Sequence, residues 1–465
     1  MNDHVEFTSS LEHAAGREAK HASILAHLQT ALEIEYSTVP IYLYTYYSIN
    51  RIPLTFPAGM SAARVEEIKT FANEAGALLM SVAVEEMLHM SLAANLIRAL
   101  GGMPDLNLYS KPSTCYPTPL PHHNPSFNPD PDAKGLLKIP LSRFSELQLG
   151  YFLAIEYPEK EHATPQGANW DTIGQFYDYI RDRLVKETTD ADYGQVDFQL
   201  GSGKGYYSPN TIDTLYPNKA NWESQPVNWN DPSARGARAA MFTNARDSGG
   251  LIAIHDKASA LRAIDTICTQ GEGSSSDPTH EHDDPRHKED THWYKFNQLH
   301  EKLKEKAFDA EALATFVHPF PDNPTREMYA HAVGYDYRPF VDLANAVFTY
   351  IFQMTQASYE LRGAAQHMMF NIGMHKGMIF VLDKIINAMR YYHTDGDGTS
   401  GKGGGAALAP SFENYPFKSL ATAKAEMVAL FSSAPLDFQQ SNTNILQRLS
   451  DLPDVHVGPG GVIRF

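Results

Sequence analysis

Glutamate and histidine recur three residues apart at four places in the sequence. On a helix this spacing puts a carboxylate and an imidazole on one face, where both can bind the same metal ion. The four pairs are Glu18/His21, Glu86/His89, Glu159/His162 and Glu289/His292. A dinuclear metal site inside a four-helix bundle needs six ligands: one glutamate from each of two helices and a Glu-x-x-His pair from each of the other two. One pair alone arises easily by chance, so the surrounding elements must decide which pairs are ligands.

The first hundred residues contain two long amphipathic patterns. Apolar residues recur there at spacings of three and four, which is typical of helices that pack one face on a core. The pattern predicts helices at about 20–49 and 62–100, and the second helix stops at the Gly101-Gly102 pair. Two long helices joined by a modest loop predict an antiparallel hairpin, the first half of a bundle.

The middle of the chain differs in composition. Residues 103–242 are rich in proline, asparagine, tyrosine and glycine, and convincing helical patterns cover only Leu141–Ile155 and Thr172–Val185. We interpret this region as a long crossover insertion with partly irregular structure. Two further amphipathic segments, at about 251–272 and 289–313, then supply the second half of the bundle.

The predicted fold class is mainly α, with two parts. A four-helix bundle that binds two metal ions occupies residues 1–318, with the crossover as its insertion. Strongly apolar helical segments at about 337–359 and 364–392 precede the glycine-rich stretch GDGTSGKGGG. We therefore expect residues 319–465 to form a C-terminal helical extension packed on the bundle.

Burial of a charged side chain is unfavourable unless something binds it. Glu86 and His89 nevertheless continue the apolar face of the second helix, and Glu35 does the same in the first. The pair Glu289/His292 stands at the expected start of the fourth helix and Glu272 at the end of the third. An antiparallel hairpin of these two helices would hold both ends together. The predicted metal ligands are therefore Glu35, Glu86, His89, Glu272, Glu289 and His292, of which Glu35, Glu86 and Glu289 are also the predicted catalytic residues.

Several alternatives stay open at this point. Glu85 is the alternative to Glu86, because either neighbour can face inward, although the spacing from His89 favours Glu86. Glu272 is flanked by glycines, so its alternative role is only to end a helix. The loop histidines are expected to be solvated, with a ligand role as the alternative; they are His280, His282 and His287.

The two remaining Glu-x-x-His pairs are set aside. Glu18/His21 lies about 20 Å or more along the first helix from Glu35, at 1.5 Å per residue. Glu159/His162 directly follows Pro158 in a stretch without helical pattern.

Four segments together resemble a known family. They are LQTALEIEYSTVPIYLYTYYSI, VAVEEMLHMSLAANLIRALGGMP, AIDTICTQGEG and EDTHWYKFNQL. Over roughly residues 20–300 the chain resembles the ferritin-like domain of the iminophenyl-pyruvate dimer synthase family, whose namesake acts in violacein biosynthesis. The resemblance implies a ferritin-like bundle whose carboxylate and histidine positions fall on the six predicted ligands.

Four carboxylates and two imidazoles form a hard, oxygen-rich donor set that suits iron or manganese. We therefore expect a non-haem diiron oxidase or oxygenase that uses O2 on a small amino-acid-derived or aromatic metabolite, in secondary metabolism. Two alternatives stay open: a dimanganese, catalase-like enzyme that acts on peroxide, and a non-catalytic ferritin-like protein that binds metal or serves as a scaffold.

Composition restricts the partners. Lys and Arg number 38 and Asp and Glu 55, for a net charge of −17, which disfavours nucleic acid. Only two cysteines, Cys115 and Cys268, occur, so we expect a reducing, cytoplasmic compartment rather than a disulfide framework. No uninterrupted apolar run of about 18 residues predicts a membrane span. A homodimer or a partner enzyme in a pathway remains open.

Overall fold

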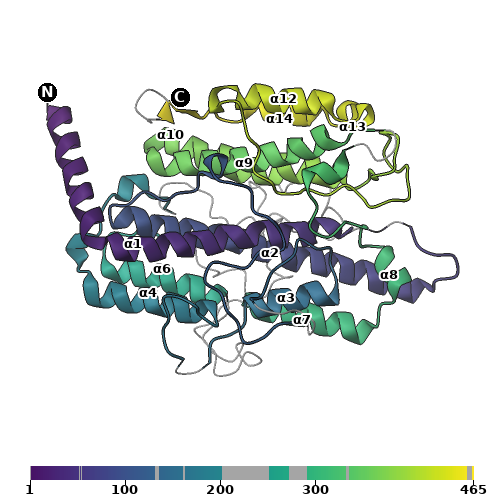
Figure 1. Ribbon diagram of the computed structural model, residues 1–465, viewed down its shortest axis with the longest axis horizontal. Helices are drawn as coiled ribbons and strands as arrows, with labels where there is room; N and C mark the ends of the chain where they lie inside the picture. The colour runs from purple at the N-terminus through teal and green to yellow at the C-terminus, as the bar shows by residue number, and fades with distance from the viewer. Residues whose placement is uncertain are drawn as a thin grey trace, which may run out of the picture.

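The computed structural model describes residues 2–51, 53, 55–130, 136–160, 163–201, 251–271, 291–330, 335–457 and 463–464. Its two longest helices, α1 (Asn2–Ser48) and α2 (Ala62–Ala99), lie side by side through the centre of the molecule (Figure 1). Ser61 begins α2 by accepting a hydrogen bond from the backbone N–H of Arg64, as a helix N-cap does. The predicted first hairpin is present.

Helix α2 is apolar along most of its length. By length and composition it could cross a membrane, but its most apolar window is entirely buried inside the protein. Helices that are hydrophobic all round are buried at the centre of a fold. Neighbouring helices therefore cover α2 on every side of that window.

A third arm of the bundle consists of two short helices placed one after the other along α1. They are α3 (Glu146–Ile155) and α4 (Ile173–Glu187). The backbone N–H of Phe144 donates to Ser48 Oγ at 2.9 Å, and Arg183 Nη1 donates to Ser23 Oγ at 2.9 Å. The arm therefore runs antiparallel to α1, from the end of α1 back toward its start.

The fourth arm is also a broken helix, and it follows α2. Its parts are α6 (Lys257–Gln270) and α7 (His292–Lys306). Asn95 Nδ2 donates to the Ile252 carbonyl oxygen at 2.8 Å, just before α6. Near the other end of α2, Lys306 Nζ lies 3.3 Å from Glu67 Oε1. The two helices thus run in sequence, antiparallel to α2.

The prediction of an antiparallel hairpin between 251–272 and 289–313 is therefore wrong. These segments form a single interrupted arm, and the helical patches inside the predicted insertion 103–242 form the other missing arm. Amphipathic periodicity identifies a face that packs on a core, but it carries no information about which neighbour that face meets or in which direction the helix runs. Four arms are still present, as predicted.

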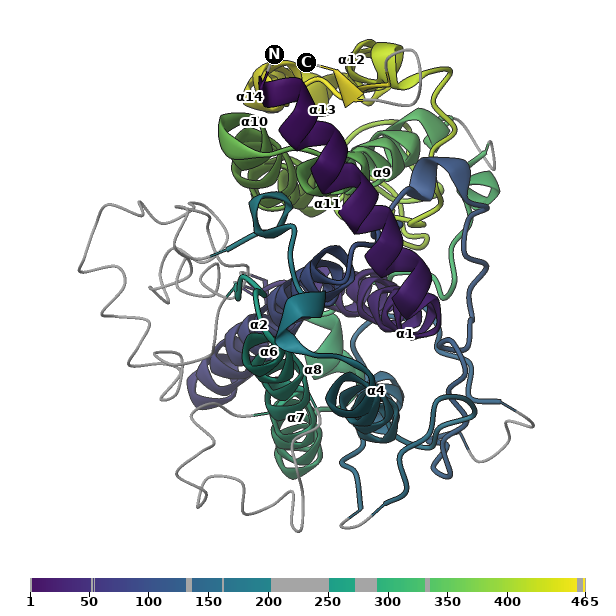
Figure 2. The same ribbon diagram turned by 90° about the vertical axis from the view of Figure 1, so that its left-hand side faces the viewer.

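The C-terminal helices form a further layer on the opposite face of α1 and α2 (Figures 1 and 2). Tyr359 Oη lies 3.2 Å from the Ser91 carbonyl oxygen, to which it donates, and Arg390 Nη1 donates to the Ile49 carbonyl at 2.9 Å. The boundary predicted between residues 318 and 319 stays a prediction. The helices of this layer are α9 (Arg338–Glu360), α10 (Gly363–Met368), π-helical turns at Met369–His375 and Gly377–Leu382, α11 (Asp383–Met389), α12 (Ala423–Ser433), α13 (Leu436–Ser441) and α14 (Thr443–Asp451).

The remaining elements are short. A small helix follows the fourth arm, and an antiparallel strand pair lies near the C-terminus. They are α8 (Ala310–Ala314), β1 (His456–Val457) and β2 (Ile463–Arg464), with single 3₁₀ turns at Leu108–Ser110, Asp190–Asp192, Val196–Phe198, Arg326–Tyr329 and Leu420–Thr422. The protein is therefore mainly α, as predicted.

Candidate metal centre

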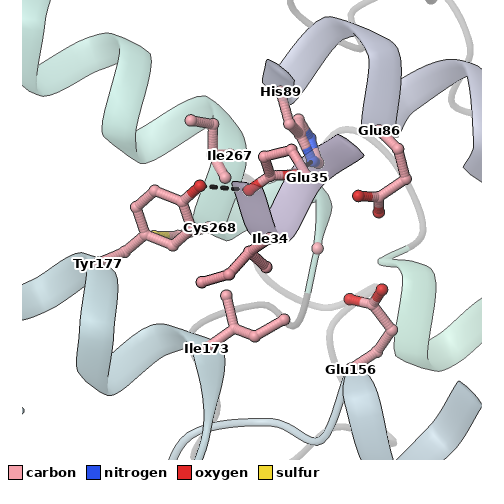
Figure 3. Close-up of a pocket in the computed structure, with 10 residues that line it drawn as sticks. Ile34, Glu35, Glu86, His89, Glu156, Ile173, Tyr177, Ile267 and Cys268 are labelled. Carbon is pink, nitrogen blue, oxygen red and sulfur yellow. Dashed lines mark hydrogen bonds and ion pairs between the residues drawn. The ribbon is translucent and has the colours of Figure 1, made fainter. Parts of the chain in front are cut away.

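Five buried ligand-type side chains meet where the two broken arms are interrupted. Glu156 ends α3 and His292 begins α7, while α1 brings Glu35 and α2 brings Glu86 and His89 to the same point. Figure 3 shows Glu35, Glu86, His89 and Glu156 around one pocket. None of the five residues is more than 3% exposed. All four arms of the bundle therefore contribute to one buried cluster.

The donor atoms lie close together. His292 Nδ1 is 2.9 Å from Glu86 Oε1 and 3.6 Å from Glu156 Oε2, and His89 Nδ1 is 3.5 Å from Glu35 Oε2. One ligand atom from each of Glu86, His89 and His292 lies within 4.8 Å of the others. The cluster thus has two halves, Glu35/His89 and Glu156/His292, and Glu86 lies near both.

Each carboxylate of the cluster accepts a hydrogen bond from a buried hydroxyl group. Two donors are tyrosines and one is a threonine, whose Oγ1 lies 2.8 Å from the carboxylate oxygen. The pairs are Tyr177 with Glu35, Tyr42 with Glu156, and Thr38 with Glu86. These bonds restrict the orientation of all three carboxylates.

Both histidine rings have a second partner on the side away from the cluster. His89 Nε2 lies 3.1 Å from Gln270 Oε1, and His292 Nε2 lies 2.9 Å from Glu85 Oε2. Each ring therefore presents Nδ1 to the cluster and Nε2 to an oxygen acceptor. Of the two neighbours weighed as ligands, Glu86 lines the pocket and Glu85 lies behind His292.

The charges of the cluster perturb its protonation. Burial raises the pKa of Glu86 to about 7, and the nearby charges of Glu156 and Glu35 act in the same direction. Burial alone would lower the pKa values of His89 and His292. The adjacent carboxylates outweigh it, chiefly Glu35 for His89 and Glu156 for His292, so both pKa values are raised. A cation that binds here displaces protons.

The two tyrosines remain hydrogen-bond donors. Burial raises the pKa of Tyr177 well above its usual range, and the charge of Glu35 adds to this effect. Burial followed by the charge of Glu156 does the same for Tyr42. Both phenols are consequently neutral at physiological pH and donate to carboxylates.

This donor set fits two ions of iron or manganese. Three carboxylates and two imidazoles are hard and borderline ligands, and no cysteine is among them. Uncompensated carboxylates in a protein core are strongly unfavourable unless they are paired or coordinate metal. The clustering of three carboxylates at one buried point is therefore best explained by cation binding.

The structure brings together four of the six residues predicted as ligands. Glu35, Glu86, His89 and His292 lie in the cluster. Glu272 and Glu289 lie outside the described residues, as do the loop histidines His280, His282 and His287.

Sequence reasoning missed Glu156. The residues Leu149, Phe152 and Glu156 follow one another at spacings of three and four, which continues an apolar helix face onto a carboxylate. That signal was present, but it lay inside the segment interpreted as a crossover. The set-aside pair Glu18/His21 lies elsewhere, where His21 Nε2 is 3.2 Å from Asp192.

A small cavity of about 10 Å³ adjoins the cluster. Besides the cluster residues and Tyr177, its wall is formed mostly by apolar side chains. These residues are Ile34, Ile173, Ile267, Cys268 and Gly271, most of which Figure 3 labels. The cavity has room for about one water molecule next to the carboxylates.

A comparison with protein families agrees with this architecture. A family model described as ferritin-like matches residues 28–301, more than half of the chain. A ferritin-like protein from Caulobacter vibrioides, known from a crystal structure, aligns over 78% of this chain and 93% of its own at 18% identity and a TM-score of 0.46. No curated protein matches the sequence.

Proposed function

Because the chain belongs to the ferritin-like family, we propose that its buried cluster binds two iron ions and that the protein is a non-haem diiron oxidase or oxygenase. The observation that carries this proposal is the convergence of Glu35, Glu86, His89, Glu156 and His292 from all four arms of the bundle. A scaffold protein has no need to keep such charges at the centre of its core, since apolar residues would pack there at lower free energy.

The two halves of the cluster divide the ions between them. Glu35 and His89 would hold one ion and Glu156 and His292 the other, with Glu86 close to both. Glu289 stands three residues before His292, and it would complete a set of six ligands. When bound, two iron ions supply redox chemistry with O2.

The protein residues around the ions have separate tasks. The hydroxyls of Tyr177, Tyr42 and Thr38 orient the three carboxylates. The isoleucines of the cavity wall present an apolar surface to one side of the cluster, which suits a weakly polar substrate. The resemblance to the iminophenyl-pyruvate dimer synthase family favours an amino-acid-derived or aromatic metabolite as that substrate.

Metal analysis of the purified full chain tests this proposal. We expect about two iron atoms per chain and an absorption change that depends on O2. Glu86→Ala should lose the metal and the absorption change, and His89→Ala should lose one ion and the absorption change. Glu159→Gln, outside the cluster, should keep the metal and the absorption change. Helix content measured by circular dichroism controls for folding.

Two outcomes would overturn the proposal. A folded wild-type chain that binds no metal would exclude the metal site itself. Two manganese atoms together with oxygen release from peroxide would replace the diiron oxidase with a peroxide enzyme on the same ligands.

A further inference from the structure

The two histidines of the cluster are supported by chemically different groups. Behind His89 lies the neutral amide of Gln270, at 3.1 Å. Behind His292 lies the carboxylate of Glu85, at 2.9 Å. An imidazole that donates from one nitrogen to a carboxylate is a stronger metal ligand at its other nitrogen. The two halves of the cluster therefore differ in donor strength.

Two consecutive glutamates bracket the ring of His292. Glu85 Oε2 lies 2.9 Å from Nε2, and Glu86 Oε1 lies 2.9 Å from Nδ1. When Nδ1 binds a cation, the ring keeps its remaining hydrogen on Nε2, where the Glu85 carboxylate accepts it. The side chain of Glu85 thus supports His292 as a ligand through Nδ1.

A buried lysine holds Glu85 in this position. Lys295 Nζ lies 2.8 Å from Glu85 Oε1 and 2.6 Å from Oε2, and the residue is only 3% exposed. Lys295 follows His292 by three residues on α7, so both side chains leave the same face of the helix. The three side chains form one connected unit of α2 and α7.

We propose that Glu85 and Lys295 are positioning residues that make the Glu156/His292 half the tighter of the two metal sites, so that it fills first and the Glu35/His89 half fills second. This inference rests on the proposed dinuclear site and adds an order of loading to it. Glu85 acts through the orientation and basicity of His292, and Lys295 acts through Glu85.

Titration of the metal-free full chain with Co²⁺, followed by calorimetry and by absorption, tests the order. We expect two resolved steps in the wild type. His292→Ala should remove the tighter step, and His89→Ala should remove the weaker one. The opposite assignment of the two steps would overturn the proposal.

Paired substitutions separate positioning from simple charge balance. E85L/K295M removes one negative and one positive charge, so the net charge is unchanged, and it also removes the acceptor for His292 Nε2. The Co²⁺ affinity of the tighter step should therefore fall about 10- to 100-fold, the range for loss of an outer partner of a metal ligand. E85Q/K295M is also neutral but keeps an amide acceptor like that of Gln270, so the two steps should become similar in affinity. Because E85Q/K295M retains this hydrogen bond, it provides the test if the first variant does not fold.

A second ion pair between the same helices provides the matched control. Lys302 on α7 contacts Glu74 on α2 in a partly exposed position away from the cluster. E74Q/K302M should leave both Co²⁺ steps unchanged. If a folded E85L/K295M also binds Co²⁺ in two steps like the wild type, the positioning role is wrong although the metal site stands. If the wild type binds no Co²⁺, the metal site itself is wrong.

Discussion

The backbone N–H of His292 donates to the carbonyl oxygen of Gly271 at 2.8 Å, so the two ends of the interrupted arm meet at the metal centre. Gly271 also lines the cavity. A Cβ at this position would lie 3.2 Å from the Ile267 carbonyl oxygen and 3.7 Å from Glu156 Oε2. The lack of a side chain at residue 271 therefore lets α6, α7 and Glu156 approach one another.

Gly271→Ala should strain this junction. The added methyl group is too close to the Ile267 carbonyl oxygen and touches the Glu156 carboxylate, so we expect a loss of about 1–3 kcal/mol in the free energy of unfolding and weaker metal binding. Chemical denaturation of the metal-free protein measures the first effect. Gly404→Ala is the control, because no atom lies within 4 Å of a Cβ there. Equal stability of both variants would contradict the prediction.

Tyr177→Phe should destabilise the metal-free protein more than an ordinary tyrosine substitution. It leaves the buried Glu35 carboxylate without the phenol that donates to it, and hydrogen bonds to charged groups contribute about 1.5–3 kcal/mol. Tyr44→Phe on α1 is the matched control, since the Tyr44 hydroxyl donates to a neutral backbone carbonyl, that of Pro321. Its expected effect is about 0.5–1.5 kcal/mol.

The affinity for metal should also differ between the two tyrosine variants. Tyr177→Phe frees Glu35 to move, so the affinity for the second ion should fall about 10-fold or more, whereas Tyr44→Phe should bind metal like the wild type. Calorimetric titration with Co²⁺ measures both. Identical affinities would mean that Tyr177 only packs against the cluster.

His123 should make the protein sensitive to mild acid. The residue is 2% exposed and stacks on Trp170 with ring centroids 4.5 Å apart, and burial lowers the pKa of His123 to about 4. The unfolded chain, with a pKa near 6.5, binds a proton more readily. Protonation of His123 therefore leaves the free energy of unfolding unchanged above pH 6.5. As the pH falls from 6.5 toward 4, the free energy of unfolding decreases by on the order of 3 kcal/mol.

His123→Phe keeps an aromatic ring on Trp170 and removes the titrating group. The free energy of unfolding, measured with a chelator at pH 7.5 and pH 5, should then change less between the two conditions than in the wild type. His255→Gln is the control, because the His255 side chain is 60% exposed. Burial also lowers the pKa of His318, to about 3, so part of the acid sensitivity should persist in both variants.

The sequence predicts the two long helices, because each contains a long amphipathic pattern. The second helix, predicted at about 62–100, is α2 (Ala62–Ala99). The first, predicted at about 20–49, is α1 (Asn2–Ser48), which ends as predicted but begins well before the predicted start. Continuous apolar periodicity, together with proline and glycine residues near the ends, is enough to predict such helices. The helices that pack against them in the fold do not need to be known. Glu35, Glu86 and His89 lie on these two helices, which explains why their positions could be anticipated.

The other two arms could not be read in the same way. The sequence predicts a helix at Leu141–Ile155, but α3 has only ten residues and lies in a region rich in proline, asparagine and glycine, so its pattern does not mark it as half of a bundle arm. Its partner α4 contacts α1 through residues that are distant in sequence. The carboxylate at the end of α3 is missed for this reason, whereas Glu272 stays a prediction because it lies outside the described residues.

Glu156 and Glu272 can be distinguished by removing one at a time. Glu156 lies 3.6 Å from His292 Nδ1 and accepts from Tyr42 inside the cluster, so Glu156→Gln should lose the ion held with His292 while the helices remain. Glu272→Gln should retain two ions per chain, because Glu156 already supplies the carboxylate of the third arm. Metal content and Co²⁺ titration measure both variants. The reverse result, with the loss in Glu272→Gln and two ions in Glu156→Gln, would restore the ligand set predicted from sequence and would assign Glu156 a role in packing with Tyr42.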